Sequence, residues 1–402
     1  MKPWLHIIGV GDEGLEHLSP ELLSVIQSAE LIIGGDRHLS MIPATISAKT
    51  MSWPSPLMKL VEDVIGMAGK QVVILATGDP MHFGIGVTFA KRLKPEDYKI
   101  YTSPSAFSLA AARLGWDLSQ VTKLTLHGRP LELIIPHLFE GAKILALSDN
   151  GETPSKLAKL LVDLGYASSS LCVLEHMGGV SENQITLPAK DWIGKNAADL
   201  NTIAITCEKS LKELTHSTAP GLNDEAFSHD GQLTKKEIRS ITLSALNPIP
   251  GLLLWDVGAG SGSIGIEWMR QNPLNRAIAV EHNESRLLHI EKNRRTLGVP
   301  ALQIVKGMAP QALDGLKHPD RIFIGGGLSL EGLFEACWSS LKSGGILVAN
   351  TVTIEGEKIA FDLFDKYDGE LSRLNVSRAN KIGGFTSWKP YRQVTQLRLI
   401  KK

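Results

Sequence analysis

The clearest pattern of apolar and polar positions lies in the second half of the chain. Residues 252–255 form a short apolar run that predicts a buried strand ending at Asp256. Glycines then occupy alternate positions over residues 258–262, and apolar residues return at helical spacing over residues 264–269. The pattern predicts a strand, a glycine turn and a helix. Such a turn lets the backbone approach a ligand closely, and the helix start offers free N–H groups.

Short apolar runs alternate with helical patterns along the first half of the chain. A helix is predicted over residues 18–29, where Ser19 is a good N-cap and Pro20 occupies the first turn. This alternation predicts α/β sheets whose loops gather at one edge. The predicted strands cover residues 4–10, 31–33, 72–76, 100–102, 123–126, 143–147, 171–174 and 202–206.

The second half continues the alternation and predicts a doubly wound sheet. Thr234 is predicted to cap a helix over residues 235–246, and further strands are predicted over residues 277–280, 302–305, 321–324, 345–349 and 396–400. The polar residues before this helix predict a linker. We therefore expect a first domain over residues 1–208, with subdomains of about 1–115 and 116–208, a linker over 209–230, and a second domain over 231–402.

Composition narrows the classes of function. Lys plus Arg equals Asp plus Glu at 42 each, so the net charge is zero, which argues against nucleic acid as a partner. No run of about 18 apolar residues occurs and the N-terminus does not resemble a signal peptide, so we expect a cytoplasmic protein with no membrane partner. Cys172, Cys207 and Cys337 are far apart, so neither a metal site nor a disulfide is expected.

The glycine turn is compatible with two classes of ligand. Gly260, Gly262 and Gly265 fit the dinucleotide pattern G-x-G-x-x-G, and Glu281 follows where an acid that binds ribose belongs. The pattern D-x-G-x-G-x-G of S-adenosylmethionine (SAM) sites covers the same turn and also uses Asp256 at the strand tip. The residues favour SAM, with NAD as the alternative.

Several segments, in their order along the chain, resemble the tetrapyrrole methylase family. The first half carries residues 8–11, 34–38, 76–80, 104–105, 126–129, 147–149 and 174–179 of this pattern, and the second half resembles the decarboxylating methylases of the vitamin B12 pathway from Thr234 to Arg378. The resemblance implies an N-terminal two-subdomain tetrapyrrole methylase fold, followed by a doubly wound, Rossmann-like SAM methyltransferase domain.

The resemblance also implies the activity. We expect C-methylation of a precorrin, or of its cobalt form, at carbon 5 by the first half and at carbon 15 by the second. The second half would also remove the carboxylate of the ring C acetate, which would give precorrin-8 in cobalamin biosynthesis. One SAM per domain and a homo-oligomer are expected. The alternatives are an NAD-linked oxidoreductase and a non-catalytic tetrapyrrole carrier.

Site residues follow from the same resemblance. In the first half, SAM is expected to contact Gly11, Gly78, Asp79, Pro80, Ser103 and Ser105; in the second half, it is expected to contact Thr234, Asp256, Gly258, Ala259, Gly260, Ser261, Gly262, Glu281 and Ala309. The substrate carries several carboxylates, so basic residues are expected to bind it. The candidates for substrate binding are Arg37, His38, His127, Arg129, Gly326, Arg378 and Lys381. The sequence does not identify a catalytic acid or base.

Overall fold

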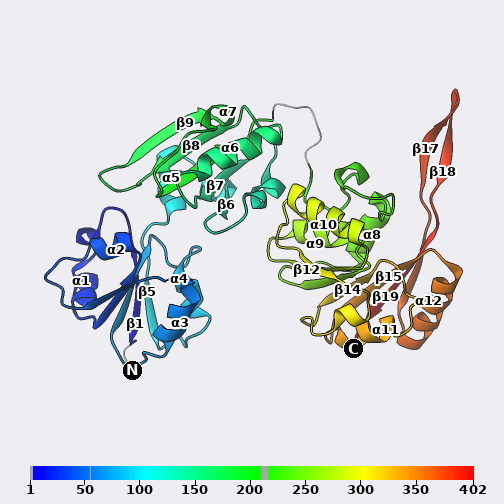
Figure 1. Ribbon diagram of the computed structural model, residues 1–402, viewed down its shortest axis with the longest axis horizontal. Helices are drawn as coiled ribbons and strands as arrows, with labels where there is room; N and C mark the ends of the chain where they lie inside the picture. The colour runs from blue at the N-terminus through cyan, green and yellow to red at the C-terminus, as the bar shows by residue number, and fades with distance from the viewer. Residues whose placement is uncertain (1–2, 55, 210–215) are drawn as a thin grey trace. The chain divides into compact units, whose positions relative to one another are not determined.

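The computed structural model describes residues 3–54, 56–209 and 216–402. The chain divides into two compact units (Figure 1): the first contains residues 1–131 and 137–213, and the second contains residues 132–136 and 214–402. Residues 210–215 of the predicted linker lie outside the described residues. Each unit is described by itself below.

The first sheet of the first unit consists of parallel strands in the order β3-β2-β4-β1-β5. Apolar side chains cover both of its faces. Ser19 caps α1, as predicted, by accepting a hydrogen bond from the N–H of Leu22 at 3.4 Å. The elements are β1 (Leu5–Val10), α1 (Pro20–Gln27), β2 (Leu31–Gly34), α2 (Asp36–Ser40), β3 (Lys49–Ser52), α3 (Leu57–Ile65), β4 (Val72–Thr77), α4 (Ile85–Ala90) and β5 (Tyr98–Tyr101).

The second sheet of this unit is mixed, with the order β6-β7-β10-β8-β9. The edge strands β3 and β9 were not predicted because most of their side chains are exposed and carry no apolar pattern. The elements are α5 (Ala106–Leu114), β6 (Thr122–Thr125), β7 (Lys143–Leu147), α6 (Thr153–Asp163), β8 (Ser170–Glu175), β9 (Asn183–Pro188), α7 (Ala189–Trp192) and β10 (Asn201–Thr206).

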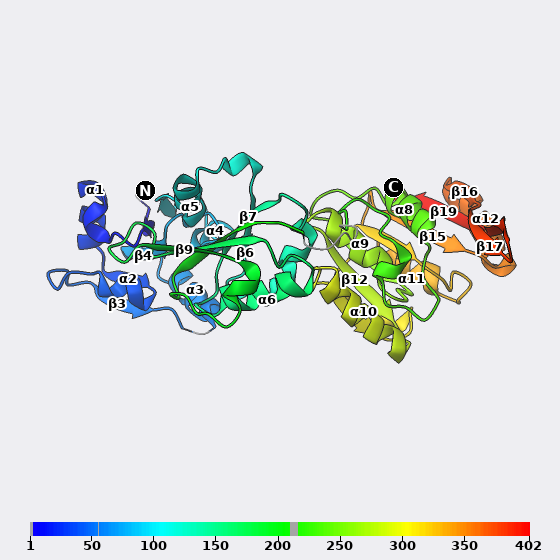
Figure 2. The ribbon, with the colours of Figure 1, turned by 90° about the horizontal axis from the view of Figure 1, so that it is seen from above.

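The second unit is a seven-stranded sheet in the order β13-β12-β11-β14-β15-β19-β16, in which β19 and β16 run antiparallel. In Figures 1 and 2, α9 and α10 lie beside β12. The elements are α8 (Lys236–Ala245), β11 (Leu253–Val257), α9 (Ser263–Gln271), β12 (Arg276–Glu281), α10 (Glu284–Thr296), β13 (Gln303–Lys306), β14 (Arg321–Ile324), α11 (Leu333–Ser340), β15 (Ile346–Thr351), α12 (Ile354–Tyr367), β16 (Glu370–Leu374) and β19 (Val394–Ile400).

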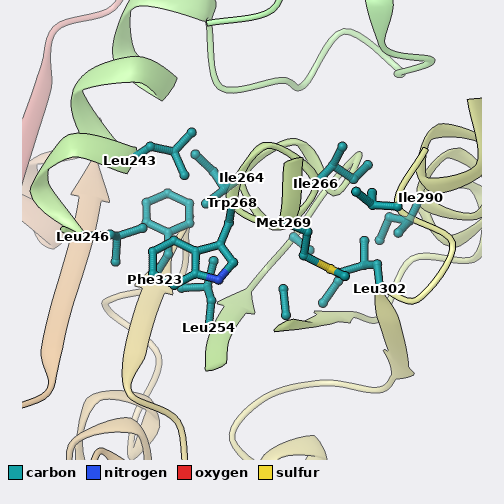
Figure 3. Close-up of a cluster of buried hydrophobic side chains, with 14 of the residues drawn as sticks. Leu243, Leu246, Leu254, Ile264, Ile266, Trp268, Met269, Ile290, Leu302 and Phe323 are labelled. Atoms are coloured by element: carbon teal, nitrogen blue, oxygen red, sulfur yellow. The ribbon is translucent and has the colours of Figure 1, made fainter. Parts of the chain in front are cut away.

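Buried clusters cover both faces of this sheet. Figure 3 shows Trp268 of α9 beside Leu254 and Phe323, and its indole N–H donates to the carbonyl of Arg276 at 3.1 Å. The helix that follows the glycine turn is therefore anchored by its buried face. This anchoring fixes the position of the turn relative to the sheet.

A hairpin of β17 (Ser377–Ile382) and β18 (Phe385–Pro390) projects from the second unit (Figure 1). Ile382, Phe385 and Trp388 are exposed on it. The sequence analysis did not predict this hairpin because it has no buried face.

Residues 216–230 belong to the second unit and differ from the predicted linker. Leu222 and Phe227 are buried in its core, and the Glu267 carboxylate accepts hydrogen bonds from the N–H groups of Gly221 and Leu222. The segment contains the 3-10 turn Asp224–Ala226. The polar composition of this segment suggested a linker. Its polar groups, however, form hydrogen bonds within the second unit.

The predicted cap of the helix after this segment is wrong. Helix α8 begins at Lys236, its N-cap is Lys235, and Thr234 does not cap it. Instead, Asp224 Oδ1 accepts the hydrogen bond of the Lys236 N–H at 3.0 Å. A carboxylate distant in sequence therefore occupies the site where a local cap was expected.

Arg239 is the buried centre of this region, with no exposed surface. Its guanidinium contacts Glu267 Oε1 at 2.5 Å and Asp224 Oδ1 at 3.2 Å. It also donates to the carbonyls of Leu222 and Thr234. One cation therefore joins residues 222–234 to α8 and α9, and it neutralises two buried carboxylates.

We expect Arg239→Leu to destabilise the second unit by about 3–5 kcal/mol, because Glu267 would be left as a buried charge without this cation and Asp224 would keep only Arg378 as a cationic partner among the described residues. Arg373→Gln, which removes an exposed ion pair with Glu357, should cost less than about 1 kcal/mol. Urea unfolding of the two full-length variants measures both values. Equal losses would contradict the central role of Arg239.

Candidate active sites

The glycine turn of the second unit begins where β11 ends. Gly258, Gly260 and Gly262 have φ values of 71°, 59° and 78°, a left-handed conformation that other residues rarely adopt. The N–H groups of Gly258 and Ala259 donate to the carbonyl of Val280, which holds the turn against β12. The predicted turn and its glycines are therefore present.

Glu281, at the end of β12, is hydrogen-bonded to this turn and is 3% exposed. Its Oε2 accepts the Gly260 N–H at 2.9 Å, and its Oε1 accepts the N–H groups of His282 and Asn283, each at 2.9 Å. A carboxylate has about four lone-pair sites, so three backbone donors leave capacity for another donor. A ribose hydroxyl could be that donor.

Asp256 is buried at the tip of β11, beside the turn. Its Oδ2 accepts the Gly265 N–H at 2.9 Å, while Oδ1 has no hydrogen-bond partner among the described residues. Burial raises the pKa of Asp256 to about 7, and the charge of Glu281 adds to this effect. The buried hydroxyl of Ser261 also lacks a partner within the described part of the chain. These polar atoms suit a ligand that donates hydrogen bonds, as a SAM molecule would.

The remaining predicted contacts near the turn of the second unit are Gly326, Ala309 and Thr234, and their surroundings differ. Gly326 lies beside the turn, since a Cβ at Gly258 would be 3.7 Å from the carbonyl oxygen of Gly326. Ala309 follows β13 and packs against the core. The Thr234 carbonyl, in contrast, accepts from Arg239.

The two basic residues predicted near the C-terminus differ in their surroundings. Arg378 contacts Glu237 at 2.7 Å and Asp224 at 3.1 Å, and these carboxylates raise its pKa further. Its charge is therefore already neutralised within the protein. Lys381 is exposed on the β17–β18 hairpin.

Asn293, which the sequence analysis did not identify, joins the turn to the segment before α8. Its side chain is buried in α10, donates to the carbonyls of Ser261 and Ser228, each at 2.9 Å, and accepts the N–H of Ser228 at 2.7 Å. A polar residue inside an apparently solvated helix carries no sequence signal of such a role.

The first unit holds a cavity between its two sheets. The predicted residues Gly11, Arg37 and Gly78 line it. Most of its lining was not predicted, because it comes from strand ends that are distant in sequence. The lining residues that were not predicted as ligand contacts, some of which lie in the family segments named above, are Asp12, Thr77, Pro104, Ala106, Leu109, Leu174, His176, Met177, Leu200, Asn201 and Thr202.

The loops around this cavity are packed backbone against backbone. A Cβ at Gly9 would lie 1.9 Å from the carbonyl oxygen of Gly78, so only glycine fits there. The hydroxyl of Ser103 donates to the Gly9 carbonyl at 2.8 Å, and Ser105 caps α5. These two serines therefore shape the loops.

The predicted loop after β4 is shaped in the same way. Asp79 Oδ1 accepts the Met81 N–H at 2.8 Å, and the carbonyl oxygen of Pro80 packs beneath Gly84 and Gly86. The side chain of Asp79 therefore stabilises its own turn. The backbone of this loop forms the edge of the cavity at Gly78.

Asp12 is the hub of polar contacts in this cavity. Its Oδ1 lies 2.8 Å from Arg37 Nη1 and its Oδ2 lies 3.0 Å from His176 Nδ1. His38 is buried beside Arg37, with its Nε2 3.0 Å from Arg37 Nη2. Burial and the Arg37 charge lower the pKa of His38 to about 4. His38 is therefore neutral and positions Arg37.

Arg129 lines a different hollow of the first unit, and His127 lies next to two of its lining residues, Leu126 and Gly128. This hollow, of about 350 Å³, is lined by Arg129, Asp149 and Lys156, among other residues. His127 is exposed, with its Nδ1 3.3 Å from Asp149 Oδ1. The lining of this hollow does not include Arg37, another of the candidates for binding the carboxylates of the substrate.

The two halves of the chain match two family models. Residues 4–191 match the tetrapyrrole (corrin/porphyrin) methylases, and residues 225–401 match the precorrin methyltransferase domain. The folds and their glycine-rich sites thus define a two-domain methyltransferase.

A precorrin-6Y C(5,15)-methyltransferase (decarboxylating) from Sinorhizobium sp is 45% identical over 396 residues, which cover 98% of this chain and 96% of that protein. The chain belongs to this family. A probable cobalt-precorrin-6B C(15)-methyltransferase (decarboxylating) from Pyrobaculum calidifontis is 35% identical, covering 42% of this chain and 89% of its own length. A cobalt-precorrin-7 C(5)-methyltransferase from Salmonella typhimurium is 26% identical, covering 46% and 90%.

These findings confirm the predicted resemblance and the predicted α/β fold class. They do not favour the NAD-linked oxidoreductase. Within residues 3–54, 56–209 and 216–402, no helix is long and apolar enough to cross a membrane.

The raised pKa of Asp256 predicts a pH-dependent stability. As the pH rises from about 4 to 7, the unfolded chain loses this proton before the folded chain does, so Asp256 destabilises the fold increasingly. Asp256→Asn cannot titrate. We expect the free energy of unfolding of this variant to rise relative to the unmodified chain over this range, by on the order of a few kcal/mol, and then to level off. Urea unfolding at several pH values tests this, and a constant difference would contradict it.

Proposed function

We propose that the chain is a bifunctional, SAM-dependent methyltransferase of cobalamin biosynthesis. It methylates precorrin-6Y, or its cobalt form, at carbons 5 and 15, and it removes the carboxylate of the ring C acetate to give precorrin-8. The observation that carries this proposal is the 45% identity to a relative of that name along 98% of the chain. The two glycine-rich sites, one in each unit, would each bind one SAM molecule.

The first unit is assigned the methylation of carbon 5 and the second the methylation of carbon 15 with decarboxylation. Two observations support this division. Relatives with the C(5) and C(15) activities in their names each match less than half of the chain. The precorrin methyltransferase model matches only the second half. We assign one domain to residues 1–208 and the other to residues 231–402 together with the packed segment 216–230, with one SAM bound in each, in a homo-oligomer.

The second unit would hold SAM through its glycine turn. The carboxylate of Glu281 accepts hydrogen bonds from the ribose diol, and Asp256 Oδ1 and the Ser261 hydroxyl gain the partners they lack. SAM supplies a methyl group that its sulfonium already activates. The remaining task of the protein is to hold donor and acceptor carbons in line, which can supply much of the rate.

The basic residues of the first unit would bind the carboxylates of the macrocycle. Arg37 is fixed by Asp12 and Thr77, so its guanidinium is presented in one orientation. Arg129 provides a second donor at its own hollow, and exposed His127 lies next to the lining residues Leu126 and Gly128. In the second unit, exposed Lys381 is the more available cation, because Arg378 is held by two carboxylates.

Two matched glycine variants test the two sites separately in the full-length chain. A side chain at Gly78 would be strained by its φ of 58° and would meet the Pro104 carbonyl oxygen at 3.0 Å; Gly260 has a φ of 59° and faces the Gln232 carbonyl oxygen. We expect the unmodified chain to bind two SAM molecules in calorimetry and no NAD. Gly78→Val and Gly260→Val should each bind one.

The products of these variants identify the reaction of each unit. With precorrin-6Y and SAM, Gly78→Val should add one methyl group and release carbon dioxide, whereas Gly260→Val should release none. Mass spectrometry of the corrinoid and trapping of carbon dioxide measure both. Carbon dioxide from Gly260→Val, or a single SAM site in the unmodified chain, would refute the assignment.

A further inference from the structure

His176 is held in a backbone conformation that histidine seldom adopts. It directly follows β8, and its φ is 48°. Its N–H donates to the carbonyl of Leu200 at 3.1 Å, and its own carbonyl accepts from Gly179 at 2.9 Å. A non-glycine residue in this left-handed region costs about 1–2 kcal/mol. Such strain often marks a functional position.

The side chain of His176 is oriented by Asp12. His176 Nδ1 lies 3.0 Å from Asp12 Oδ2, and Arg37 holds the other oxygen of Asp12 at 2.8 Å. The backbone of Gly179 closes over this contact, since a Cβ there would be 2.4 Å from Asp12 Oδ2. The carboxylate thus keeps the proton on Nδ1 and leaves Nε2 as an acceptor.

Nε2 of His176 makes no hydrogen bond with a described residue, and the side chain is 32% exposed where it lines the cavity. His38, in contrast, is buried, and its Nε2 already contacts Arg37 and Thr77. Glu13 lies against Gly178 and is not among the lining residues. His176 is therefore the lining group best placed to accept a proton from a molecule in the cavity.

Methylation of a ring carbon requires such an acceptor. The π electrons of the macrocycle form the new C–C bond, and the electrons of the broken S–CH₃ bond return to sulfur. The ring carbon then carries both a methyl group and its original hydrogen. Loss of that hydrogen as a proton returns its bonding electrons to the ring. One proton is released for each methyl group transferred.

We propose that His176, oriented by Asp12, accepts this proton at Nε2 during methylation in the first unit. The inference rests on the proposed function and deepens it by giving a chemical role to a residue that the resemblance contained only as part of a motif. Asp12 acts as a positioning residue, as in other sites where a carboxylate orients a histidine base.

The test replaces the imidazole without disturbing the backbone. His176→Gly suits the left-handed conformation and leaves space for free imidazole. In the full-length chain we expect carbon-5 methylation to slow by roughly 100-fold or more, while SAM affinity changes less than about twofold. Added imidazole should restore part of the rate. With substrate deuterated at carbon 5, the variant should show an isotope effect larger than that of the unmodified chain.

His318→Gly is the matched control, because this exposed histidine belongs to the second unit and contacts only the Ser340 carbonyl among the described residues. Its rate should not respond to imidazole. Asp12→Asn should slow methylation without rescue by imidazole. If His176→Gly does not fold, His176→Asn serves in its place, because Asn tolerates the left-handed region.

The outcomes separate this inference from the proposed function. An undiminished rate in a folded His176→Gly variant would refute the proton-accepting role alone. A lost rate with weakened SAM binding and no imidazole rescue would also refute it, and would make His176 a structural contact between the two sheets. An unmodified chain that never methylates carbon 5 would refute the proposed function and this inference with it.

Discussion

The close approach of backbone loops at the strand tips is the constraint on which both units depend. At Gly9 a Cβ would lie 1.9 Å from the Gly78 carbonyl oxygen, and at Gly325 it would lie 3.1 Å from that of Gly258. Side chains are excluded from these contacts, so the loops present N–H and C=O groups to the space beyond the strands. In both folds, closely packed backbone at the strand tips can therefore offer hydrogen-bonding groups to a polar ligand.

Loops packed so closely need support, and buried carboxylates provide it. Glu281 accepts three backbone N–H groups beneath the glycine turn, and Glu267 accepts two from residues 221–222. In the first unit, the partly buried Asp12 holds Arg37 and His176. A buried carboxylate is stable only with donors around it, so each acid also determines the positions of its partners.

The features that could be predicted from the sequence are those that local patterns determine. Apolar runs gave most of the strands, and the glycine turn was placed correctly at residues 258–262. The cap of α8 could not be predicted, because Asp224, which supplies it, lies twelve residues away across a turn. The role of Arg239 was missed for a similar reason: a single arginine in a helix usually indicates an exposed face, and its partners come from separate segments.

Candidate sites were predictable to the same extent. Glycines and acids at strand tips carry a local signal, so Gly78, Asp256 and Glu281 were predicted as ligand contacts. His176 was quoted only as part of a motif, because its role depends on Asp12, which follows β1, far away in sequence. Contacts between strand ends depend on strand order, and the order β6-β7-β10-β8-β9 cannot be inferred from any local sequence pattern.

The two sites also differ in which polar groups remain available. In the second unit, Asp256 Oδ1 and the Ser261 hydroxyl lack partners within the described residues, so these groups at the glycine turn are available to a ligand. In the first unit, both oxygens of Asp12 are engaged, and among the described lining residues the groups without a hydrogen-bond partner include Nε2 of His176 and the amide oxygen of Asn201, of which only the imidazole is basic. The second site is therefore built mainly to bind through backbone and acids, whereas the first directs an oriented side chain at whatever occupies its cavity.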